Sequence, residues 1–513
     1  MNYEIKSHLV LLTLKYNYVI IKKEKLIHKQ SGGIVMRVCI TPNDADVVSK
    51  TDSESIQRAV DLAKKTGINK VVIPAYNERT GKNIWEIDKA IVLESDIEIV
   101  LDNSYLIQKE GCFDNVFRNF NDDAMRKSFK EEQHNIHIRG VGNAVIDGGK
   151  HNGLTEANSS KNGMPNISVN NVIKLHNLRG FSIEGITIKN QRWWAINLIY
   201  CEQGKISDLN IIAENNVPNQ DGIDLRIGCH DIIIENIFGQ SGDDFIALSG
   251  FWGGSEANKY EVYGKSKDIH DIIIKNIIAT SADCAVIALR NHDGVRLYNV
   301  SIDKVYDTLN GNENNNVYNY QHLQDCRDVV GQKSPYAVVR INQYAFWNNE
   351  KNKPGETYGI NITNIYSRCN AAVMINGSLE NSYIGNIYAN GVTNYAITTK
   401  SDWSFKESGQ TFGADMKNVV IENIFFNSAS KKAVVLDFDI SSDEHITKDN
   451  KVEKNRMYSV ENVIIKNVFC GAAKTALNMQ HNGSLNIEKL FTAGDMNINK
   501  NVGSVFLDGE KVI

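Results

Sequence analysis

The sequence predicts an all-β protein, a single-stranded right-handed parallel β-helix (a solenoid) with an N-terminal capping helix. Two observations carry this prediction. A phrase returns along the chain, as HDIIIENI at His230 and HDIIIKNI at His270, and more loosely as YGINITNI, KNVVIENI and ENVIIKNV. In each copy apolar residues occupy alternate positions and an Asn accompanies them, which indicates a buried strand beside a turn.

The short repeat explains why the strands are expected to stack. Where loops are short, one unit follows the next after roughly 20 residues, too few to close a core alone. Stacked units pair each strand with its equivalent one coil on, and a recurring Asn forms a ladder at the turn. A leucine-rich repeat would need helix signals in every unit, and a sandwich fits the long Ile runs poorly. We expect about ten coils, right-handed because crossovers between parallel strands prefer that hand.

The N-terminal end is predicted to be a cap. The segment TDSESIQRAVDLAKKTGINKVVIP begins at Thr51 and reads as an amphipathic helix followed by a strand. Thr51 and Glu54 form a capping-box pattern, and Gly67 ends the helix. An open solenoid end exposes apolar side chains and unpaired strand edges, which such a helix covers. The apolar stripe that would face the solenoid consists of Ile56, Ala59, Val60 and Ala63.

Three segments follow from this pattern. Residues 1–35 are expected to be a non-native or disordered extension, because SGGIVM before Met36 is what a translated ribosome-binding region would encode. Residues 36–80 form the cap segment. Residues 81–513 form the β-helix that carries the catalytic site.

Composition narrows the classes of function. The chain has 513 residues, 42% of them hydrophobic, and a net charge of −5, which gives no reason to expect nucleic acid as a partner. No apolar run reaches membrane-spanning length. The eight Cys are scattered without a CxxC pair, so we expect free thiols, no metal and no cofactor. Free thiols and the lack of a signal-peptide pattern favour a cytoplasmic protein.

Three carboxylates stand out against the apolar strands. Asp221 lies in NQDGID, and Asp243 and Asp244 lie in GDDFIAL. Asp221 and Asp243 are 22 positions (243 − 221) apart, about one coil, so all three would project onto one surface from neighbouring coils. Glycoside hydrolysis needs one carboxylic acid and one carboxylate, and crowding raises the pKa of at least one acid. The alternative is that both motifs are turns with solvated acids.

Several motifs resemble glycoside hydrolase family 28, the polygalacturonase family of the pectin-lyase-like β-helix superfamily. AVIDGGKHNG is similar to its IDG-GG signature, and QRWWAINLIYCEQGKISDLNI resembles its Trp-containing coil. NQDGID and GDDFIAL resemble its Asn-Thr-Asp and Gly-Asp-Asp motifs. The resemblance implies an inverting hydrolase of a pectin-related oligosaccharide, with Asp243 as general acid. It implies that Asp221 and Asp244 hold and deprotonate the water.

The chain departs from the family at two motifs. The family carries Gly-His-Gly on the next coil, whereas the counterpart here, ADCAVIAL, has no His; His292 could take its place, although a turn histidine is the commoner case. The family's Arg-Ile-Lys, which grips the substrate carboxylate, is matched by Arg340 but has Asn342 in place of Lys. A different uronide or a neutral sugar therefore stays open. The candidate substrate-binding residues are Arg340, Asn219, Trp194, Arg226, Arg290 and His292.

Two other functions stay open. A polysaccharide lyase on the same scaffold would use the acids to hold Ca²⁺ beside a basic proton abstractor. A non-catalytic carbohydrate-binding β-helix would need neither. The sequence predicts a carbohydrate partner in every case and does not predict the oligomeric state.

Overall fold

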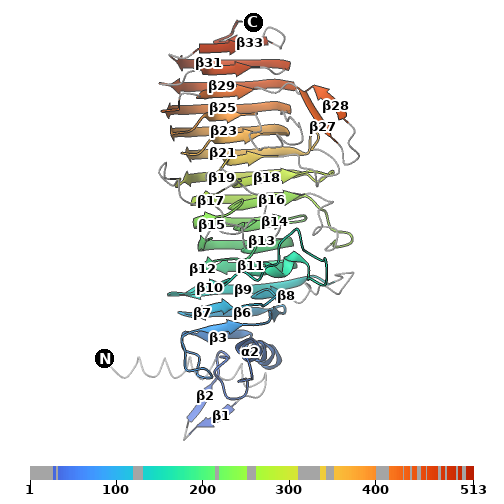
Figure 1. Ribbon diagram of the computed structural model, residues 1–513, viewed down its shortest axis with the longest axis vertical. Coiled ribbons are helices and arrows are strands. Elements are labelled where there is room, and N and C mark those ends of the chain that lie inside the picture. The colour runs from blue at the N-terminus through green and yellow to red at the C-terminus, as the bar shows by residue number, and fades with distance from the viewer. Residues whose placement is uncertain are drawn as a thin grey trace, which may run out of the picture.

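The computed structural model is a parallel β-helix with an N-terminal capping helix. Figure 1 shows a tall stack of coils with the capping helix at the bottom and the C-terminal end at the top. The strands join into one 30-stranded sheet that winds along the stack. The structure describes residues 27–30, 33–119, 131–213, 219–250, 261–282, 284–309, 335–342, 352–399, 415–430, 433–438, 442–446, 452–457, 459–471, 475–479, 482–492, 495–498 and 504–512.

Each coil contributes strands to long parallel faces. The face that contains the repeated phrase is formed by β3 (Lys70–Pro74), β6 (Ile97–Asp102), β9 (Gln133–Val141), β11 (Ile173–Glu184), β13 (Ile196–Ile212), β15 (His230–Ser241), β17 (Ile269–Ser281), β19 (Leu297–Asp307), β21 (Thr357–Ser367), β23 (Ser378–Gly391), β25 (Asp415–Ser428), β29 (Ser459–Cys470), β31 (Asn482–Thr492) and β33 (Ser504–Leu507). These strands pair in that order, so the stack has more coils than the roughly ten that the sequence predicts.

A second face carries the acidic motifs. It starts with β5 (Ile91–Leu93) and β8 (Phe117–Asn119) and passes through the first parts of β11 and β13. It continues with β14 (Ile223–Arg226), β16 (Ile246–Gly250), β18 (Ala285–Asn291), β20 (Ala337–Ile341), β22 (Ala371–Ile375), β24 (Tyr395–Thr398), β26 (Val434–Phe438), β30 (Thr475–Met479) and β32 (Asp495–Ile498). Near the N-terminus a shorter face contains β4 (Trp85–Ile87), β7 (Tyr105–Gln108), β10 (Val145–Asp147) and β12 (Thr187–Lys189).

The repeated phrases stack directly on one another, as predicted. His230 lies opposite His270, which lies opposite Tyr298, and Tyr298 lies opposite Tyr358. This register keeps the same side chains inward on every coil, because a strand alternates its faces with a period of two. One inner row is isoleucine throughout and is buried: Ile234, Ile274, Ile302, Ile362, Ile384, Ile421, Ile465 and Ile487.

The recurring Asn forms the predicted ladder at the turn. Asn386 has a left-handed backbone with φ of 55°, as have its neighbours Asn364 and Asn423. Its side-chain amide donates to Asn364 Oδ1 at 3.2 Å, and Asn423 Nδ2 donates to Asn386 Oδ1 at 3.0 Å. Asn suits this place because it tolerates positive φ better than most residues and its amide can both donate and accept.

The predicted capping helix is α2 (Asp52–Thr66). Thr51 Oγ1 accepts from the Glu54 N–H at 3.2 Å, and Gly67 ends the helix with φ of 71°. The predicted apolar stripe is buried under the first coils. β3 already pairs with β6, so the continuous sheet begins at Lys70, inside the segment predicted as cap.

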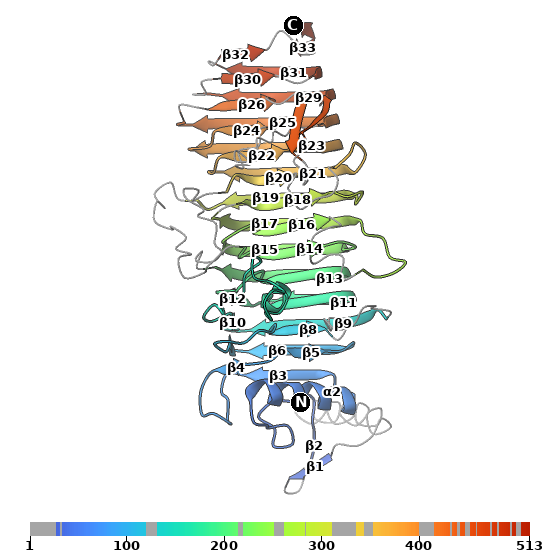
Figure 2. The same ribbon diagram turned by 45° about the vertical axis from the view of Figure 1, so that its right-hand side comes forward.

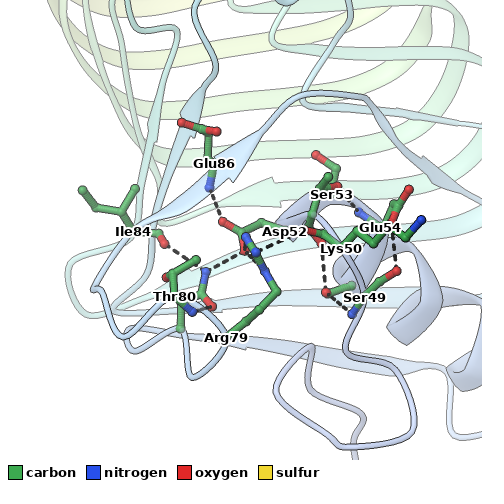
Figure 3. A network of polar contacts seen from close by, with 12 residues as sticks. Ser49, Lys50, Asp52, Ser53, Glu54, Arg79, Thr80, Ile84 and Glu86 are labelled. Atoms are coloured by element: carbon green, nitrogen blue, oxygen red, sulfur yellow. Dashed lines mark hydrogen bonds and ion pairs between the residues drawn. The ribbon is translucent and has the colours of Figure 1, made fainter.

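A buried carboxylate ties the helix to the first coil. Asp52 is 2% exposed and accepts four hydrogen bonds (Figure 3). Arg79 Nε and Nη2 donate to its Oδ1 at 2.9 and 2.6 Å, and Asn77 Nδ2 donates to the same oxygen at 2.7 Å. The backbone N–H of Glu86 donates to Oδ2 at 2.8 Å. The charge is therefore compensated where it is buried.

Other segments stand apart from the stack. β1 (Ile27–Gln30) and β2 (Gly33–Met36) pair only with each other, and residues 1–26 lie outside the described residues. β27 (Ser442–Ile446) and β28 (Val452–Met457) form a separate antiparallel hairpin. β34 (Glu510–Lys511) pairs with β33 at the C-terminal end, and η1 (Ile167–Asn170) is a short 3-10 helix.

Among the described helices, none is long and apolar enough to cross a membrane. Every cysteine in the described ranges is a free thiol.

Two variants of Asn386 are expected to separate the effect of its side-chain hydrogen bonds from the effect of its left-handed backbone conformation. Asn386→Ala places in a left-handed turn a residue that tolerates this conformation less well than Asn, and it removes two hydrogen bonds, so we expect a loss of about 2–3 kcal/mol in the free energy of unfolding. Asn386→Gly removes the same bonds without the left-handed strain and should cost about 1 kcal/mol less. Urea denaturation followed by circular dichroism measures both. Equal losses would show that the turn conformation contributes nothing.

Removing the Asp52 carboxylate is expected to loosen the cap. Asp52→Ala leaves the partly buried Arg79 guanidinium without its anion, so we expect a loss of about 3–5 kcal/mol. Thermal and urea denaturation measure it. The control is Lys150→Ala, which breaks the exposed ion pair with Glu110 and should cost about 1 kcal/mol or less. A similar small loss for Asp52→Ala would contradict the anchoring role.

Candidate active site

The three predicted acids lie where the chain enters two neighbouring strands. Asp221 precedes β14, and Asp243 and Asp244 precede β16. Ile223 lies opposite Ile246, so the coil here is 23 positions (246 − 223) long, and the backbone N–H of Gly222 donates to Asp244 O at 3.1 Å. Asp221 therefore lies opposite Asp244 on the next coil, and Asp243 lies one residue before Asp244 in the chain. Figure 2 shows β14, β16, β18 and β20 stacked in this order.

Asp244 is completely buried and held by two arginines. Arg340 Nη2 donates to both of its oxygens, at 3.1 and 3.2 Å, and Arg290 Nη2 lies 3.1 Å from Oδ2. The backbone N–H of Ala285, on the next coil, donates to Oδ1 at 2.9 Å. Each of these partners donates a hydrogen bond, and two of them are cationic guanidinium groups. Asp244 is thus held in a fixed position at the centre of the cluster.

Asp243 is half-buried and is the most accessible of the three acids. Its Oδ1 accepts from its neighbour's backbone N–H at 2.8 Å, and Asn219 Nδ2 donates to Oδ2 at 3.3 Å. The Cys284 thiol also hydrogen-bonds its carboxylate. Burial and then the charge of Asp244 raise the pKa of Asp243, against the opposing effect of Cys284 and Arg290. The two serines Ser241 and Ser281 fix this turn by donating to the Asp243 carbonyl, each at 2.6 Å.

Asp221 and Asp224 are buried acids. Among the residues that the structure describes, Asp221 Oδ1 and both oxygens of Asp224 have no hydrogen-bond partner, and the two side chains are 3% and 0% exposed. Burial, and then the charges of Asp243, Asp224 and Asp244, raise the pKa of Asp221 well above its usual range. Burial raises the pKa of Asp224 in the same way, while Arg226 and Arg290 oppose the shift. Since so many acids are crowded together, we infer that the cluster holds protons near neutral pH.

The predicted binding residues lie around these acids. Arg290, at the end of β18, also donates to Ser249 Oγ at 3.0 Å. Burial tends to lower the pKa of Arg290, but Asp244, Asp221 and Asp243 together hold it above its usual value. The Arg226 guanidinium lies 4.9 Å from the centre of the Trp194 ring, which stacks on Trp193 at 3.9 Å. These contacts place Trp194 in a buried aromatic cluster, and its binding role stays a prediction.

The structure shows what the residues at the two departures from the family motifs contact. Arg340 is 2% exposed and engages Asp244, while its Nε and Nη1 have no partner within the described parts of the chain. Asn342 does not supply the missing lysine function, because its amide donates to Thr357 Oγ1 and to the Ser378 carbonyl. His292 is buried in the turn after β18, where its backbone N–H donates to Gly250 O at 2.9 Å. The roles of Arg340 and His292 in binding stay predictions.

Sequence reasoning missed two residues of this cluster. Asp224 follows Asp221 in the same motif, and the alternation in β14 places Asp224 and Arg226 on the outer face together. This alternation of apolar and charged residues in the sequence could have identified Asp224.

Cys284 lies on the coil where the family carries His, and its Sγ is within 4.8 Å of oxygens of Asp243 and Asp244. In the sequence, Cys284 is only one of eight scattered cysteines that are expected to be free thiols.

The donor set of Asp243, Asp244 and Cys284 suits a calcium ion poorly. Ca²⁺ takes six to eight oxygen ligands, and a thiol is a soft ligand that it does not prefer. Asp244 is already engaged by two guanidinium groups, which would repel a cation at the same place. The arrangement therefore favours acid–base chemistry over a metal-dependent reaction.

A hollow of about 420 Å³ lies elsewhere, on the outer surface of β15, β17, β19 and β21. It is lined mainly by turn residues and exposed isoleucines, among them Asp231, Asp271, Ile233 and Ile273. These acids sit in the turn ladder, and no cationic side chain lines the hollow. The convergence of acids and arginines beside β14 and β16 is the better candidate for catalysis.

Residues 65–253 match the family model described as Glycosyl hydrolases family 28. This segment includes Asn219, Asp221, Asp243 and Asp244, and it confirms the resemblance seen in the sequence. The family 28 match supports a glycosidase of the polygalacturonase type. No curated protein is similar enough in sequence to match.

Solved β-helix structures are also similar to the chain. A tailspike protein mutant of E. coli bacteriophage HK620 in complex with pentasaccharide has 13% identity and a TM-score of 0.49, with 94% of this chain and 82% of that chain covered. The family 28 exopolygalacturonase of Yersinia enterocolitica has 14% identity and a TM-score of 0.42, with 92% and 79% covered.

The raised pKa of Asp221 predicts a pH-dependent gain on its removal. A group whose pKa is higher in the folded state favours folding below its unfolded pKa, near 4, and loses that contribution as pH rises through the folded pKa. Asp221→Asn should therefore become progressively more stable than the wild type from about pH 4 upward. Urea denaturation at several pH values measures the difference. Asp61→Asn on the exposed face of α2 serves as control and should show no such trend. A difference that is constant or falls with pH would contradict the assignment.

Proposed function

We propose that the protein hydrolyses a pectin-related or similar plant or microbial oligosaccharide by carboxylic acid and carboxylate catalysis, with inversion. The observation that supports this most is the gathering of Asp221, Asp243 and Asp244 on adjacent coils, with two arginines holding Asp244 in place. Hydrolysis of a glycosidic bond needs a proton donor and a group that activates water. The cluster provides an aspartate for each of these two tasks.

Asp243 is the proposed general acid. Its raised pKa favours retention of the proton near neutral pH, and it is more accessible than the other two acids. A partly accessible, protonated carboxyl can reach the leaving oxygen of a bound sugar. Asn219 and Cys284 hold the side chain in place.

Asp221 is the proposed holder of the attacking water, with Asp244 beside it on the next coil. Both oxygens of Asp244 already accept hydrogen bonds from protein donors, so Asp244 acts by positioning its neighbours. Asp221 has an oxygen without a partner, which can accept a hydrogen bond from water. Its raised pKa also makes it a stronger base once it is ionised.

The sugar next to the cleaved bond is either a uronide or a neutral sugar. Arg340 Nε and Nη1 and Arg290 Nε are buried donors that find no partner among the described residues, so a substrate carboxylate or hydroxyl is a suitable acceptor for them. The missing lysine removes one cation that a galacturonate would meet in the family. We place the protein in the cytoplasm, where short imported oligosaccharides and exo action would suit it.

The deciding experiment compares variants on a panel of pectic oligosaccharides and their carboxyl-reduced forms. Asp243→Asn keeps the shape but cannot donate the proton, so kcat should fall about 10²–10⁴-fold. The matched control is Asp437→Asn, a buried acid on β26 several coils away, which should leave kcat unchanged. Proton NMR of the first product should show the inverted anomer.

Other outcomes would assign a different function. Wild-type activity retained by Asp243→Asn would remove Asp243 from the mechanism. An unsaturated product absorbing in the ultraviolet, lost on adding a chelator, would indicate a lyase. Binding of oligosaccharides without turnover by the wild type would indicate a carbohydrate-binding β-helix.

A further inference from the structure

A continuous apolar ridge runs along the outside of the β-helix, away from the acids. It occupies one outward position on eight successive coils of the face that contains the repeated phrase. Figure 1 shows the strands that carry it, from β15 to β31, stacked one above the other. The outer ridge consists of Phe238, Ile278, Tyr306, Tyr366, Tyr388, Phe425, Phe469 and Phe491.

Six of the eight ridge side chains are more than a third exposed. Phe238 is 44% exposed, Phe425 42% and Phe491 54%. A fully exposed aromatic side chain offers roughly 200 Å², so the eight side chains leave about 600 Å² of contiguous apolar surface. The largest apolar patch on a typical monomer is of about this size and often marks an interaction site.

The geometry of the rings argues against a sugar chain as the occupant. Tyr366 and Tyr388 stack with centroids 4.7 Å apart and an angle of 8°, and Phe425 and Phe469 stack at 5.2 Å and 4°. Each ring face in the middle of the ridge is therefore covered by its neighbours. Sugars bind aromatic side chains through the ring face, whereas the stacked rings in the middle of this ridge offer their edges.

The flanking charges argue against nucleic acid and anionic lipid. Glu235 pairs with Lys275 at 2.8 Å, and Lys466 pairs with Glu488 at 3.4 Å. Between these two pairs the same row carries acidic or uncharged residues, namely Asp303, Thr363, Gly385 and Glu422. The row therefore pairs its two lysines with glutamates and is acidic or neutral elsewhere. A partner that binds through phosphate charge would meet no basic patch here.

We propose that the outer ridge is the contact surface between two copies of this chain. A second copy carries the same ridge with the same coil repeat of about 4.8 Å, so the two can stay in contact along their whole length. Burying the ridge on both copies removes about 1,200 Å² from water, and the polar rows beside it add to this, which reaches the size of a stable protein interface. An apolar centre with a polar rim is the usual composition of such interfaces.

Self-association at micromolar concentration tests the proposal. Sedimentation velocity of the full chain between 0.5 and 50 µM, on the order of the affinities expected for such an area, should show a shift from one copy to two. Tyr388→Lys with Phe425→Glu should weaken the association at least tenfold. The matched control is Ile233→Lys with Ile273→Glu, which alters two exposed apolar residues of the neighbouring outward row and should leave the association unchanged.

Hydroxyl-radical footprinting of the unaltered protein keeps the test independent of whether the variants fold. Tyr388, Phe425 and Phe469 should be labelled at least threefold less at high than at low concentration. Tyr263, which is 99% exposed, should be labelled equally at both. A single copy at every concentration, association that survives the ridge variants, or equal labelling of the ridge would overturn the proposal. Binding to phosphatidylcholine vesicles in place of self-association would overturn it as well.

Discussion

The structure depends on the registered pairing of each coil with the next. Parallel hydrogen bonds fix which residue lies above which, and this one constraint produces the inner isoleucine rows, the asparagine ladder and the outer ridge. It also brings Asp221 level with Asp244. Because register sets position on every face at once, a one-residue slip would move core residues outward and separate the acids. Selection on the core therefore also maintains the site.

The electrostatic properties of the site follow from the crowding of its acids. Four acids lie within interaction range of one another, and three of them are nearly or completely buried. Arg290 and Arg340 contact Asp244 directly, whereas Asp221 and Asp224 have oxygens that no described residue hydrogen-bonds. These oxygens are acceptors that a bound water or a substrate hydroxyl can use.

Much of the fold could be predicted because its signals are local. The repeated phrase, the alternation of isoleucines and the Thr51 to Gly67 helix limits all act over a few residues, and the structure confirms them. The placement of the acids on neighbouring coils also followed from spacing, although the spacing pointed to Asp243 as the partner of Asp221 and the register selects Asp244. A single residue of difference lies within the uncertainty of loop length.

The remainder of the site depends on contacts between distant residues. Arg340 meets Asp244 across 96 positions, and no local pattern reveals that its guanidinium is engaged there. The number of coils was underestimated because the loosely matching units near both ends lack the full phrase. Asp224 was visible in the sequence, but its lack of partners follows from burial, which only the assembled stack determines.

The coils differ in length while their pairing does not change. From Tyr358 to its partner Glu380 the chain takes 22 positions (380 − 358), whereas from Tyr298 to its partner Tyr358 it takes 60 (358 − 298), yet both pairs are aligned. Additional residues are therefore inserted between strands without disturbing the strands themselves. Evolution can lengthen or exchange these insertions freely, so that new specificities arise at the rim while the chemistry beneath is inherited intact.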